Sequence, residues 1–426
     1  MKKKVLTAAL AFVLSANICG SVSAAEAALT IGDNTVTVNG REQTIDAPPV
    51  IINERTLVPL RFIAELFGSN VSWDAETKTV YISDNGKNAS DTASAVSAAA
   101  KSVDPDTALS LWTDGAQAKE KLVSYMQAIT DENGADYIPV ENRIAVFDLD
   151  GTLFCETDPN YFDYMLLVHR VLEDESYKDK ASDFEKETAQ KIVTQNETGE
   201  SFKGLETDHG KCIASSFAGM TLEEFNAYIQ KFKQSGMPSY NGLKRGEGWY
   251  KPMLEIVNYL QANDFTVYIV SGTDRLIVRG IVDNSPVNIP MSQVIGSDET
   301  IVASSQDGKD GLDYVFTEND KLVLGGDFII KNLKMNKVSV IAQEIGVQPV
   351  LSFGNSTGDS SMAEYTTSNN KYKSLAFMLC CDDTERENGN VEKADKMYSL
   401  CEEYGWIPVS MKNDWTTIYG SGVTKK

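Results

Sequence analysis

Beyond residue 106, short apolar runs alternate along the chain with longer segments whose apolar residues recur at helical spacing. The apolar runs cover residues 143–147, 265–270, 349–354, 374–380 and 407–410. Helical spacing occupies residues 116–129, 253–263 and 336–346. Apolar strands that alternate with helices are typical of a parallel sheet with helices on both faces. The pattern therefore predicts an α/β fold for residues 107–426.

Between the first and second of these strands, residues 158–250 carry several helix-like segments in succession. The clearest begins at Thr221, which with Glu224 forms the capping box that starts a helix. The apolar and aromatic residues that follow on one helical face are Phe225, Tyr228, Ile229 and Phe232. We therefore predict a helical insertion at about residues 158–250.

Residues 30–83 follow a different pattern, which mixes strands with one helix. Residues 35–38 alternate as a strand does and lead into Asn39-Gly40, a hairpin turn signal. Residues 60–68 are predicted to form a helix and residues 71–82 a second hairpin. We predict a small α+β module at residues 25–83. A linker rich in Ser, Ala, Asn and Asp follows at residues 84–106.

The first 24 residues have the pattern of a secretory signal peptide. Lys2, Lys3 and Lys4 precede a short apolar run, and the small residues of "SVSA" place cleavage after Ala24. The apolar run is too short to span a bilayer, and no other run is long enough. We therefore expect a secreted or cell-surface protein with no membrane span in the mature chain.

Composition narrows the classes of partner. A chain of 426 residues is too long for one ordinary core, and 42% hydrophobic residues suffice to build one in each of two domains. The net charge of −22 argues against nucleic acids and anionic membranes, which call for basic patches.

The cysteines give no sign of a disulfide framework. Cleavage after Ala24 leaves five of them at irregular spacing: Cys155, Cys212, Cys380, Cys381 and Cys401. We interpret them as buried or free thiols, and a single disulfide stays open.

Residues with reactive side chains follow three of the predicted strands and open one helix. In chain order they are Asp148, Asp150, Ser271, Gly272, Lys337, Asn355 and Asp359. Ligands of open α/β sheets bind beyond the carboxyl ends of the strands, so we expect this set to meet at one rim. Residues i and i+2 of a strand point to the same side, so Asp148 and Asp150 both face the predicted cleft.

The set and its order resemble the haloacid dehalogenase-like superfamily of phosphohydrolases over residues 107–420. The residues that carry the resemblance are Asp148-Leu149-Asp150-Gly151-Thr152, Ser271, Lys337 and the "GNSTGDSSM" stretch at 354–362. The segments "LSLWTDGAQAKEKL", "FDLDGTLFCE" and "GWIPVSMKNDW" look like a branch near the phosphoserine phosphatase-like acid phosphatases. The resemblance implies a Rossmann-like parallel sheet, with the helical insertion as a cap over the site.

The resemblance also implies a role for each residue. Asp148 would attack the phosphorus and form an aspartyl-phosphate, because carboxylates are competent nucleophiles. Asp150 would protonate the leaving alkoxide and later activate water. Ser271 and Gly272 would hold phosphoryl oxygens, and Lys337 would offset their charge. Ser271 as an ordinary strand-end cap stays open, as does the choice among Lys331, Lys334 and Lys337.

The resemblance further implies Mg²⁺, which prefers oxygen ligands. Its ligands would be the side chains of Asp148 and Asp359 and the backbone carbonyl of Asp150. Many relatives have an acid where this chain has Asn355, so Asn355 is expected to be a secondary ligand. Glu156 would contact the amino group of a substrate or the cap, or stand as an exposed loop carboxylate.

Residues 38–82 resemble the copper amine oxidase N-terminal-like module, or stalk domain, of exported proteins. No copper-ligating histidine cluster accompanies it, since His169 and His209 lie outside the module. A spacer or an attachment to a cell-wall or surface component is the role we expect for it.

Together these patterns predict an exported Mg²⁺-dependent phosphomonoesterase acting on a small organic phosphate, with phosphoserine-like compounds at the head of the candidates. Two alternatives remain: phosphotransfer to an alcohol on the same fold, and a surface-binding protein whose phosphatase fold is vestigial. A dehalogenase is disfavoured because such relatives have no use for Asp150.

Overall fold

The computed structural model describes residues 27–38, 41–45, 47–52, 55–66, 69–74, 79–84 and 104–426. The chain divides into two compact units between Ser102 and Val103, within the predicted linker. The predicted signal peptide at residues 1–24 and nearly all of the predicted linker at residues 84–106 lie outside the described residues.

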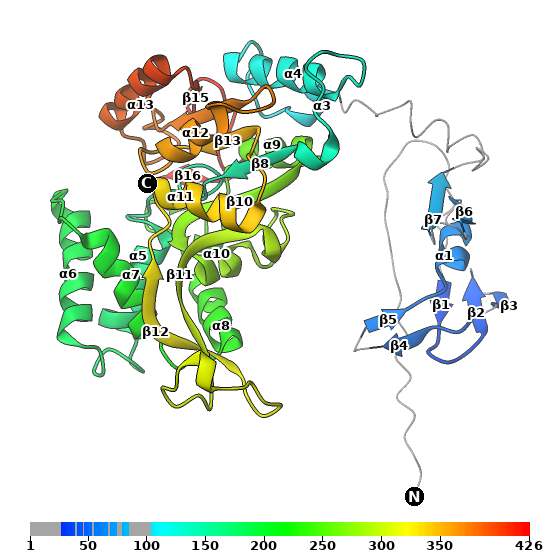
Figure 1. Ribbon diagram of the computed structural model, residues 1–426, viewed down its shortest axis with the longest axis horizontal. Coiled ribbons are helices and arrows are strands. Elements are labelled where there is room, and N and C mark those ends of the chain that lie inside the picture. Colours follow the sequence, from blue (N-terminus) through cyan, green and yellow to red (C-terminus); the bar gives the residue numbers. More distant parts are fainter. Residues whose placement is uncertain are drawn as a thin grey trace, which may run out of the picture. The chain divides into compact units, whose positions relative to one another are not determined.

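The N-terminal unit combines short antiparallel strands with one helix in its described residues (Figure 1). Its strands are β1 (Ala27–Leu29), β2 (Thr35–Val38), β3 (Arg41–Thr44), β4 (Val50–Ile52), β5 (Arg55–Leu57), β6 (Ser69–Asp74) and β7 (Thr79–Asp84). They pair as β1-β2-β3, β4-β5 and β6-β7, and α1 spans Leu60–Leu66. The predicted helix and both hairpins are present, although the Asn39-Gly40 turn lies outside the described residues.

The C-terminal unit is built on a seven-stranded sheet in the order β12-β11-β10-β8-β13-β14-β15. The strands are β8 (Ile144–Phe147), β10 (Thr266–Asp274), β11 (Val294–Ala303), β12 (Leu322–Ile330), β13 (Leu351–Gly354), β14 (Leu375–Cys380) and β15 (Ile407–Ser410). A separate two-stranded pair consists of β9 (Tyr240–Asn241) and β16 (Thr424–Lys425). All sheet neighbours are parallel except β11 and β12. The predicted α/β fold is confirmed.

Helices surround this sheet and form the insertion. The α-helices are α3 (Pro105–Ala108), α4 (Gln117–Thr130), α5 (Phe162–Val168), α6 (Asp183–Thr198), α7 (Leu205–Ser216), α8 (Leu222–Lys233), α9 (Lys251–Gln261), α10 (Arg275–Val282), α11 (Met335–Val340), α12 (Ser360–Thr367) and α13 (Val391–Tyr404). Short 3₁₀ or π turns are η1 (Val140–Asn142), η2 (His169–Glu173), η3 (Arg245–Glu247), η4 (Met291–Gln293), η5 (Gly311–Asp313) and η6 (Ile341–Ile345). Helices α5 to α8 fall within residues 158–250, which are called the cap below. Each described helix is too short or too polar to cross a membrane.

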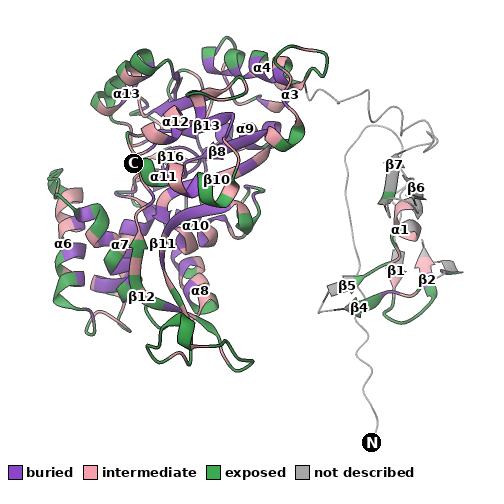
Figure 2. Cartoon of the chain, in the orientation of Figure 1, coloured by how far each residue is buried: buried purple, intermediate pink, exposed green. Residues whose placement is uncertain are grey.

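The strand that leads to the predicted site is buried along its whole length (Figure 2). On one face of the sheet, Phe147 of β8 stacks on Phe353 of β13 at 4.3 Å between ring centroids, and Phe353 stacks on Phe377 of β14 at 4.8 Å. On the other face, Val146 packs in a cluster with residues of β10 and β11 and with Met362 of α12. Burial on both faces fixes β8, and therefore fixes where its carboxyl end delivers the next residues.

Strands β11 and β12 are the part of the sheet that the sequence pattern did not predict. Strand β12 returns antiparallel to β11 and forms the edge of the sheet. The Gly325-Gly326 pair in its middle breaks the apolar run that would have marked a strand. The β11–β12 pairing changes register on both sides of Glu299, which are bulges that bend the hairpin.

The bent hairpin reaches the cap, where it runs beside α7 (Figure 1). Leu324 of β12 accepts a hydrogen bond from the backbone N–H of Gly219 at 2.8 Å and donates its own N–H to the carbonyl of Met220 at 2.9 Å. Phe328 lies so close to α7 that a Cβ added to Gly210 would be 2.6 Å from its ring. The cap is therefore attached to the edge of the sheet as well as through its two chain connections.

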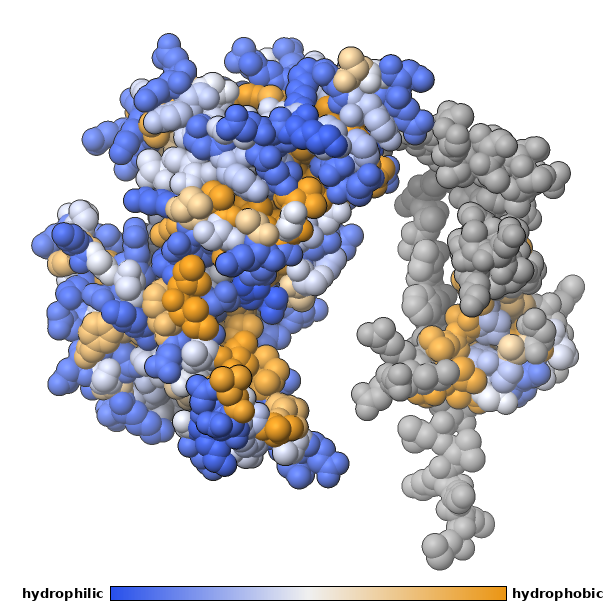
Figure 3. Space-filling view, viewed as in Figure 1, coloured by the Kyte–Doolittle hydropathy of each residue, from blue (hydrophilic) through white to orange (hydrophobic). Residues whose placement is uncertain are grey.

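Apolar side chains gather on the exposed part of the hairpin (Figure 3). The exposed large hydrophobic residues of this region are Ile301, Leu312, Val315, Phe316, Leu322 and Ile329. Leu312 at the tip is 96% exposed. Single exposed apolar residues are ordinary, whereas a contiguous group of them is a feature of the surface.

Glu299, at the bulge, is 7% exposed, and neither of its carboxylate oxygens has a partner among the described residues. Burial, with the nearby charges of Asp274 and Asp298, raises the pKa of Glu299 to about 9. From about pH 4.5 to pH 9 the folded chain holds this proton and the unfolded chain does not. The contribution of Glu299 to the free energy of unfolding is therefore fully present below pH 4.5 and is lost as the pH rises from 4.5 to about 9.

Glu299→Gln removes this titration. We expect its stability relative to the wild type to improve by roughly 1 kcal/mol per pH unit between pH 5 and pH 8. Urea unfolding of both proteins at pH 5, 6, 7 and 8 measures the slope. Exposed Glu318 in the same hairpin loop supplies the matched control, Glu318→Gln, which should show no such trend. A stability difference independent of pH would contradict the assignment.

Candidate active site

The acidic pair stands where β8 ends. Asp148 is the first residue beyond the strand, and its backbone N–H donates to the carbonyl of Phe353 at 2.9 Å. The chain then turns tightly, with the N–H of Gly151 donating to the carbonyl of Phe154 at 2.7 Å. Asp148 and Asp150 are 7% and 8% exposed. Their burial is costly for charged groups and requires partners.

Lys337 supplies the partner of Asp148. Its ammonium nitrogen lies 2.6 Å from Asp148 Oδ1 and 2.6 Å from Asp359 Oδ1, and its side chain is fully buried. Burial would lower the pKa of Lys337, but the two carboxylates raise it above its ordinary value. One ammonium for two carboxylates leaves an excess of negative charge. Burial and the charge of Asp359 raise the pKa of Asp148 to about 7, against the opposing effect of Lys337.

Asp359 is held by the loop after β13. Its Oδ2 accepts hydrogen bonds from the backbone N–H groups of Asn355 and Ser356, both at 3.1 Å, and from Ser356 Oγ at 3.2 Å. A Cβ added to Gly354 would lie 2.5 Å from the Asp359 Cβ, so the loop closes against the strand only because residue 354 is glycine. The loop thereby aims Asp359 at Lys337.

Asp150, two residues after the candidate nucleophile Asp148, lies beside β10. Its Oδ2 accepts a hydrogen bond from Thr273 Oγ1 at 2.7 Å, and its Oδ1 is buried with no partner among the described residues. Burial, followed by the charges of Asp163 and Asp148, raises the pKa of Asp150 well above its ordinary value, although Thr273 opposes this. A carboxyl group kept protonated is suited to general-acid work.

Ser271 is placed differently from the phosphate-binding expectation. It is fully buried, and its Oγ accepts a hydrogen bond from the backbone N–H of Thr273 at 3.1 Å. Its carbonyl accepts from Asn332 Nδ2 at 3.0 Å. Gly272 and Thr273 border the cavity, whereas Ser271 does not. Its role in phosphate binding stays a prediction, and in this geometry the hydroxyl bonds to the backbone within β10.

The three candidate lysines have separate positions. Lys337 touches both carboxylates, and Lys331 borders the cavity. Lys334 has a left-handed backbone with φ +55°, and its N–H donates to the carbonyl of Gly358 at 2.8 Å. The geometry thus brings Lys337 to Asp148 and Asp359 and leaves Lys331 as a second cation at the rim.

Glu156 borders the cavity and is also bonded to protein groups. Its Oε1 accepts from Asn355 Nδ2 at 3.1 Å and from Tyr161 OH at 3.4 Å, and it forms an ion pair with Lys393. Thr273, which bonds to Asp150, and Lys393, which pairs with Glu156, were not among the residues predicted from the sequence. The i+2 spacing from Ser271 would have indicated Thr273, whereas Lys393, on a distant helix, had no local signal.

A cavity of about 400 Å³ joins these groups to the cap. Its wall on the sheet side includes Asp148, Asp150, Gly272, Thr273, Lys331, Leu333, Asn355, Ser356 and Asp359. Its wall on the cap side includes Tyr161, Asp163, Tyr164, Gln195, Phe202, Lys203 and Glu206. The site therefore opens into a space between the sheet and the cap with polar and aromatic walls, of a size suited to a small ligand.

The donor groups fit Mg²⁺ bound through few protein ligands. In the described residues, no three His, Cys, Asp or Glu side chains gather as a metal cage. The groups at hand are all oxygens: two carboxylates with excess negative charge, a backbone carbonyl and the Asn355 amide. Mg²⁺ commonly takes one or two carboxylates and completes its shell with water and substrate phosphate. This donor set matches that mode of Mg²⁺ coordination.

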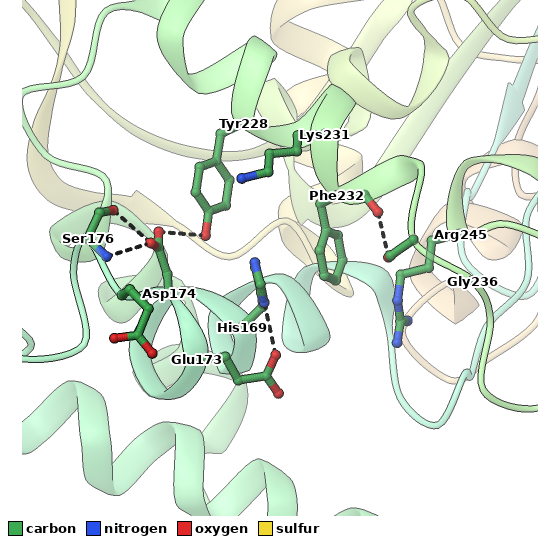
Figure 4. A pocket seen from close by; sticks show the side chains of 11 residues that line it. His169, Glu173, Asp174, Ser176, Tyr228, Lys231, Phe232, Gly236 and Arg245 are labelled. Atoms are coloured by element: carbon green, nitrogen blue, oxygen red, sulfur yellow. Dashed lines mark hydrogen bonds and ion pairs between the residues drawn. The ribbon is translucent and has the colours of Figure 1, made fainter.

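A second cavity, of about 760 Å³, lies within the cap and shares no wall residue with the first (Figure 4). Figure 4 shows His169, Tyr228 and Phe232 around it, with Arg245 beside Gly236. His169 Nδ1 is paired with Glu173 at 2.9 Å, and Tyr228 donates to Asp174 at 3.0 Å. Neither predicted catalytic residue reaches this space.

Two family models match the chain. The haloacid dehalogenase-like hydrolase model covers residues 145–364, and the copper amine oxidase N-terminal domain model covers residues 18–82. The chain thus belongs to the haloacid dehalogenase-like hydrolase family and carries a copper amine oxidase N-terminal domain in front. The predicted resemblances are confirmed. No curated protein matches the chain in sequence.

Solved structures with low sequence identity resemble the chain. A protein of unknown function from Anaerococcus prevotii DSM 20548 is 14% identical, with a TM-score of 0.42, and the alignment covers 69% of this chain and 91% of that one. Cytosolic 5′-nucleotidase IIIB bound to cytidine is 12% identical, with a TM-score of 0.42 and coverages of 70% and 88%. A substrate-bound phosphoserine phosphatase is 15% identical, with a TM-score of 0.30 and coverages of 62% and 98%.

Proposed function

We propose that this protein is a phosphomonoesterase that hydrolyses a small organic phosphate through an aspartyl-phosphate on Asp148. The observation that carries the proposal is the arrangement at the end of β8. A carboxylate there contacts a fully buried lysine, and a second carboxyl, with its pKa raised by burial and by neighbouring acids, stands two residues away. Membership of the hydrolase family supports the same reaction class.

The residues divide the work as follows. An oxygen of Asp148 forms a bond to phosphorus while the bond to the ester oxygen breaks. Asp150 transfers its proton to that leaving oxygen, then takes a proton from the water that hydrolyses the aspartyl-phosphate. Lys337 offsets negative charge on the transferring group. Each step balances, with an alcohol and inorganic phosphate as products.

Mg²⁺ would be held by Asp148, Asp359, the Asp150 carbonyl and Asn355, where it would neutralise phosphate charge and orient the ester. The cap supplies one wall of the cavity and so reduces the contact of the site with water. A space of about 400 Å³ between the sheet and the cap favours small phosphorylated metabolites over phosphoproteins.

The contacts of Glu156 refine the substrate list. An acid free to bind an amine would favour phosphoserine-like compounds. Here Lys393 already neutralises Glu156, and Asn355 and Tyr161 occupy the same oxygen. A substrate amine would therefore have to share Glu156 with Lys393, and phosphoserine-like compounds are candidates on the same footing as other small organic phosphates.

Turnover of p-nitrophenyl phosphate tests the reaction class. We expect the purified protein to release p-nitrophenol with Mg²⁺ present, and we expect EDTA to abolish the release and added Mg²⁺ to restore it. A parallel panel of phosphorylated metabolites would rank substrates by kcat/KM. Absence of EDTA-sensitive turnover on the whole panel would refute the proposed function and favour a binding protein on this fold.

We propose further that the protein is exported and that the N-terminal module attaches it to a cell-wall or surface component. The signal-peptide pattern and the match to a copper amine oxidase N-terminal domain support this proposal. Mass spectrometry of the protein from a Gram-positive host should find a mature N-terminus near residue 25. Recovery of the uncleaved chain from the cytoplasm would refute export.

A further inference from the structure

Asn355 raises a question that the proposed chemistry leaves open. A carboxylate presents an acceptor on either side, whereas an amide presents an oxygen on one side and a donor on the other. An amide at a Mg²⁺ site is useful only if its oxygen faces the cleft. Some neighbouring group must therefore fix its orientation.

Glu156 occupies the position that does this. Its Oε1 accepts a hydrogen bond from Asn355 Nδ2 at 3.1 Å, which directs the amide nitrogen toward Glu156 and the amide oxygen to the other side. The side chain of Glu156 is only 12% exposed, so it needs compensation for its charge. Lys393 supplies that compensation as an ion pair to the same oxygen.

Lys393 is itself held in place. It lies in the first turn of α13, where the side chain of Asn390 accepts a hydrogen bond from the Lys393 backbone N–H at 2.9 Å. Burial would lower the pKa of Lys393, but Glu156 raises it above its ordinary value. Helix α13 lies outside the segment of 145–364 that matches the hydrolase family, so this contact reaches the site from beyond that segment.

Gly151 makes room for the arrangement. A Cβ at this position would lie 1.9 Å from Asn355 Nδ2 and 3.2 Å from the Glu156 carboxyl carbon. The amide and the acid thus rest directly against the turn that follows Asp150. With φ +79°, Gly151 also adopts a backbone that other residues rarely take.

We infer that Glu156, paired with Lys393, is a positioning residue that orients the Asn355 amide so that its oxygen serves the Mg²⁺ site. This inference rests on the proposed function, because it assumes that Mg²⁺ binds beside Asp148. It assigns Glu156 to the protein's own architecture and not to a substrate amine.

Mg²⁺ affinity, measured by isothermal titration calorimetry, is the readout. Glu156→Ala removes the acceptor, and we expect the Kd for Mg²⁺ to rise about 10-fold or more. Glu156→Gln keeps an oxygen for Asn355, so its Kd should stay closer to that of the wild type. Lys373→Met is the matched control, since Lys373 forms an ion pair with Asp136 at the surface.

Asn355→Asp gives a sharper test. Simple charge counting predicts tighter Mg²⁺ binding, but the new carboxylate would face Glu156 with no proton between them. We expect Asn355→Asp to bind Mg²⁺ no tighter than the wild type. In the double variant with Glu156→Gln, the new amide can donate a hydrogen bond to the carboxylate introduced at position 355. This double variant should bind Mg²⁺ at least about 10-fold tighter than Asn355→Asp alone.

The outcomes separate this inference from the proposed function. If the wild type neither binds Mg²⁺ nor turns over a phosphate, both fail. If the wild type does both and Glu156→Ala binds Mg²⁺ equally well, the inference alone fails. A raised KM for one phosphate with an unchanged Mg²⁺ affinity would return Glu156 to a substrate contact. Thermal unfolding of each variant confirms that it is folded.

Discussion

Asp148→Asn is expected to reduce kcat by roughly 10⁴-fold or more, because an amide of the same shape cannot form the aspartyl-phosphate. The fold should survive, since Lys337 keeps Asp359 as its second partner at 2.6 Å. Initial rates on p-nitrophenyl phosphate, with thermal unfolding alongside, measure both effects.

Asp136→Asn is the matched control for this variant. Asp136 is an exposed aspartate that forms an ion pair with Lys373 at 2.9 Å. We expect its kcat to equal that of the wild type. A kcat for Asp148→Asn within about 10-fold of the wild type would remove Asp148 from the role of nucleophile.

Lys337→Met is expected to damage both catalysis and stability. Loss of the only cation that contacts Asp148 and Asp359 among the described residues should lower kcat by about 10²- to 10³-fold. Two buried carboxylates would be left facing each other, and removing one partner of a buried ion pair costs about 3–5 kcal/mol. We therefore expect a clearly lower Tm, measured by calorimetry beside the kcat measurement.

The surface variant Lys373→Met again serves as control, because it loses an ion pair whose side chains are about half exposed. Its Tm and kcat should stay close to those of the wild type. Full activity in Lys337→Met would transfer the charge-offsetting role to Lys331, the lysine that borders the cavity on its sheet side.

Much of the fold was predictable because its strands are buried on both faces. Such strands read as continuous apolar runs, and β8, β13 and β14 were each placed to within about two residues. Strands β11 and β12 were both missed. The Gly-Ser-Asp-Glu stretch at 296–299 interrupts the apolar run of β11, and the Gly325-Gly326 pair interrupts that of β12, whose edge position leaves it half-exposed. The hydrophobic pattern of a segment indicates how far it is buried, and most residues of β12 are not buried.

Some residues of the site were likewise predictable from the sequence, and others were not. Asp148 and Asp359 were predictable because they follow strands, and the structure brings both to Lys337. The sequence could not identify that lysine, because Lys331, Lys334 and Lys337 lie close together along the chain. The left-handed backbone that distinguishes Lys334 is visible only in the structure. Lys393 was beyond reach, because it is 237 residues from Glu156 and the contact depends on how α13 packs.

The attachment of the cap to the hairpin restricts how the cap can open during turnover. A cap tethered only by its two chain connections could swing about them while the sheet stayed still. Here Leu324 bonds to Gly219 and Met220, so any outward swing that admits substrate must either break those bonds or carry β12 along. The bulges at Glu299 and the Gly325-Gly326 pair are the places where the hairpin would bend if β12 moved with the cap. An opening of the cap that keeps these hydrogen bonds would therefore bend the β11–β12 hairpin at the edge of the sheet.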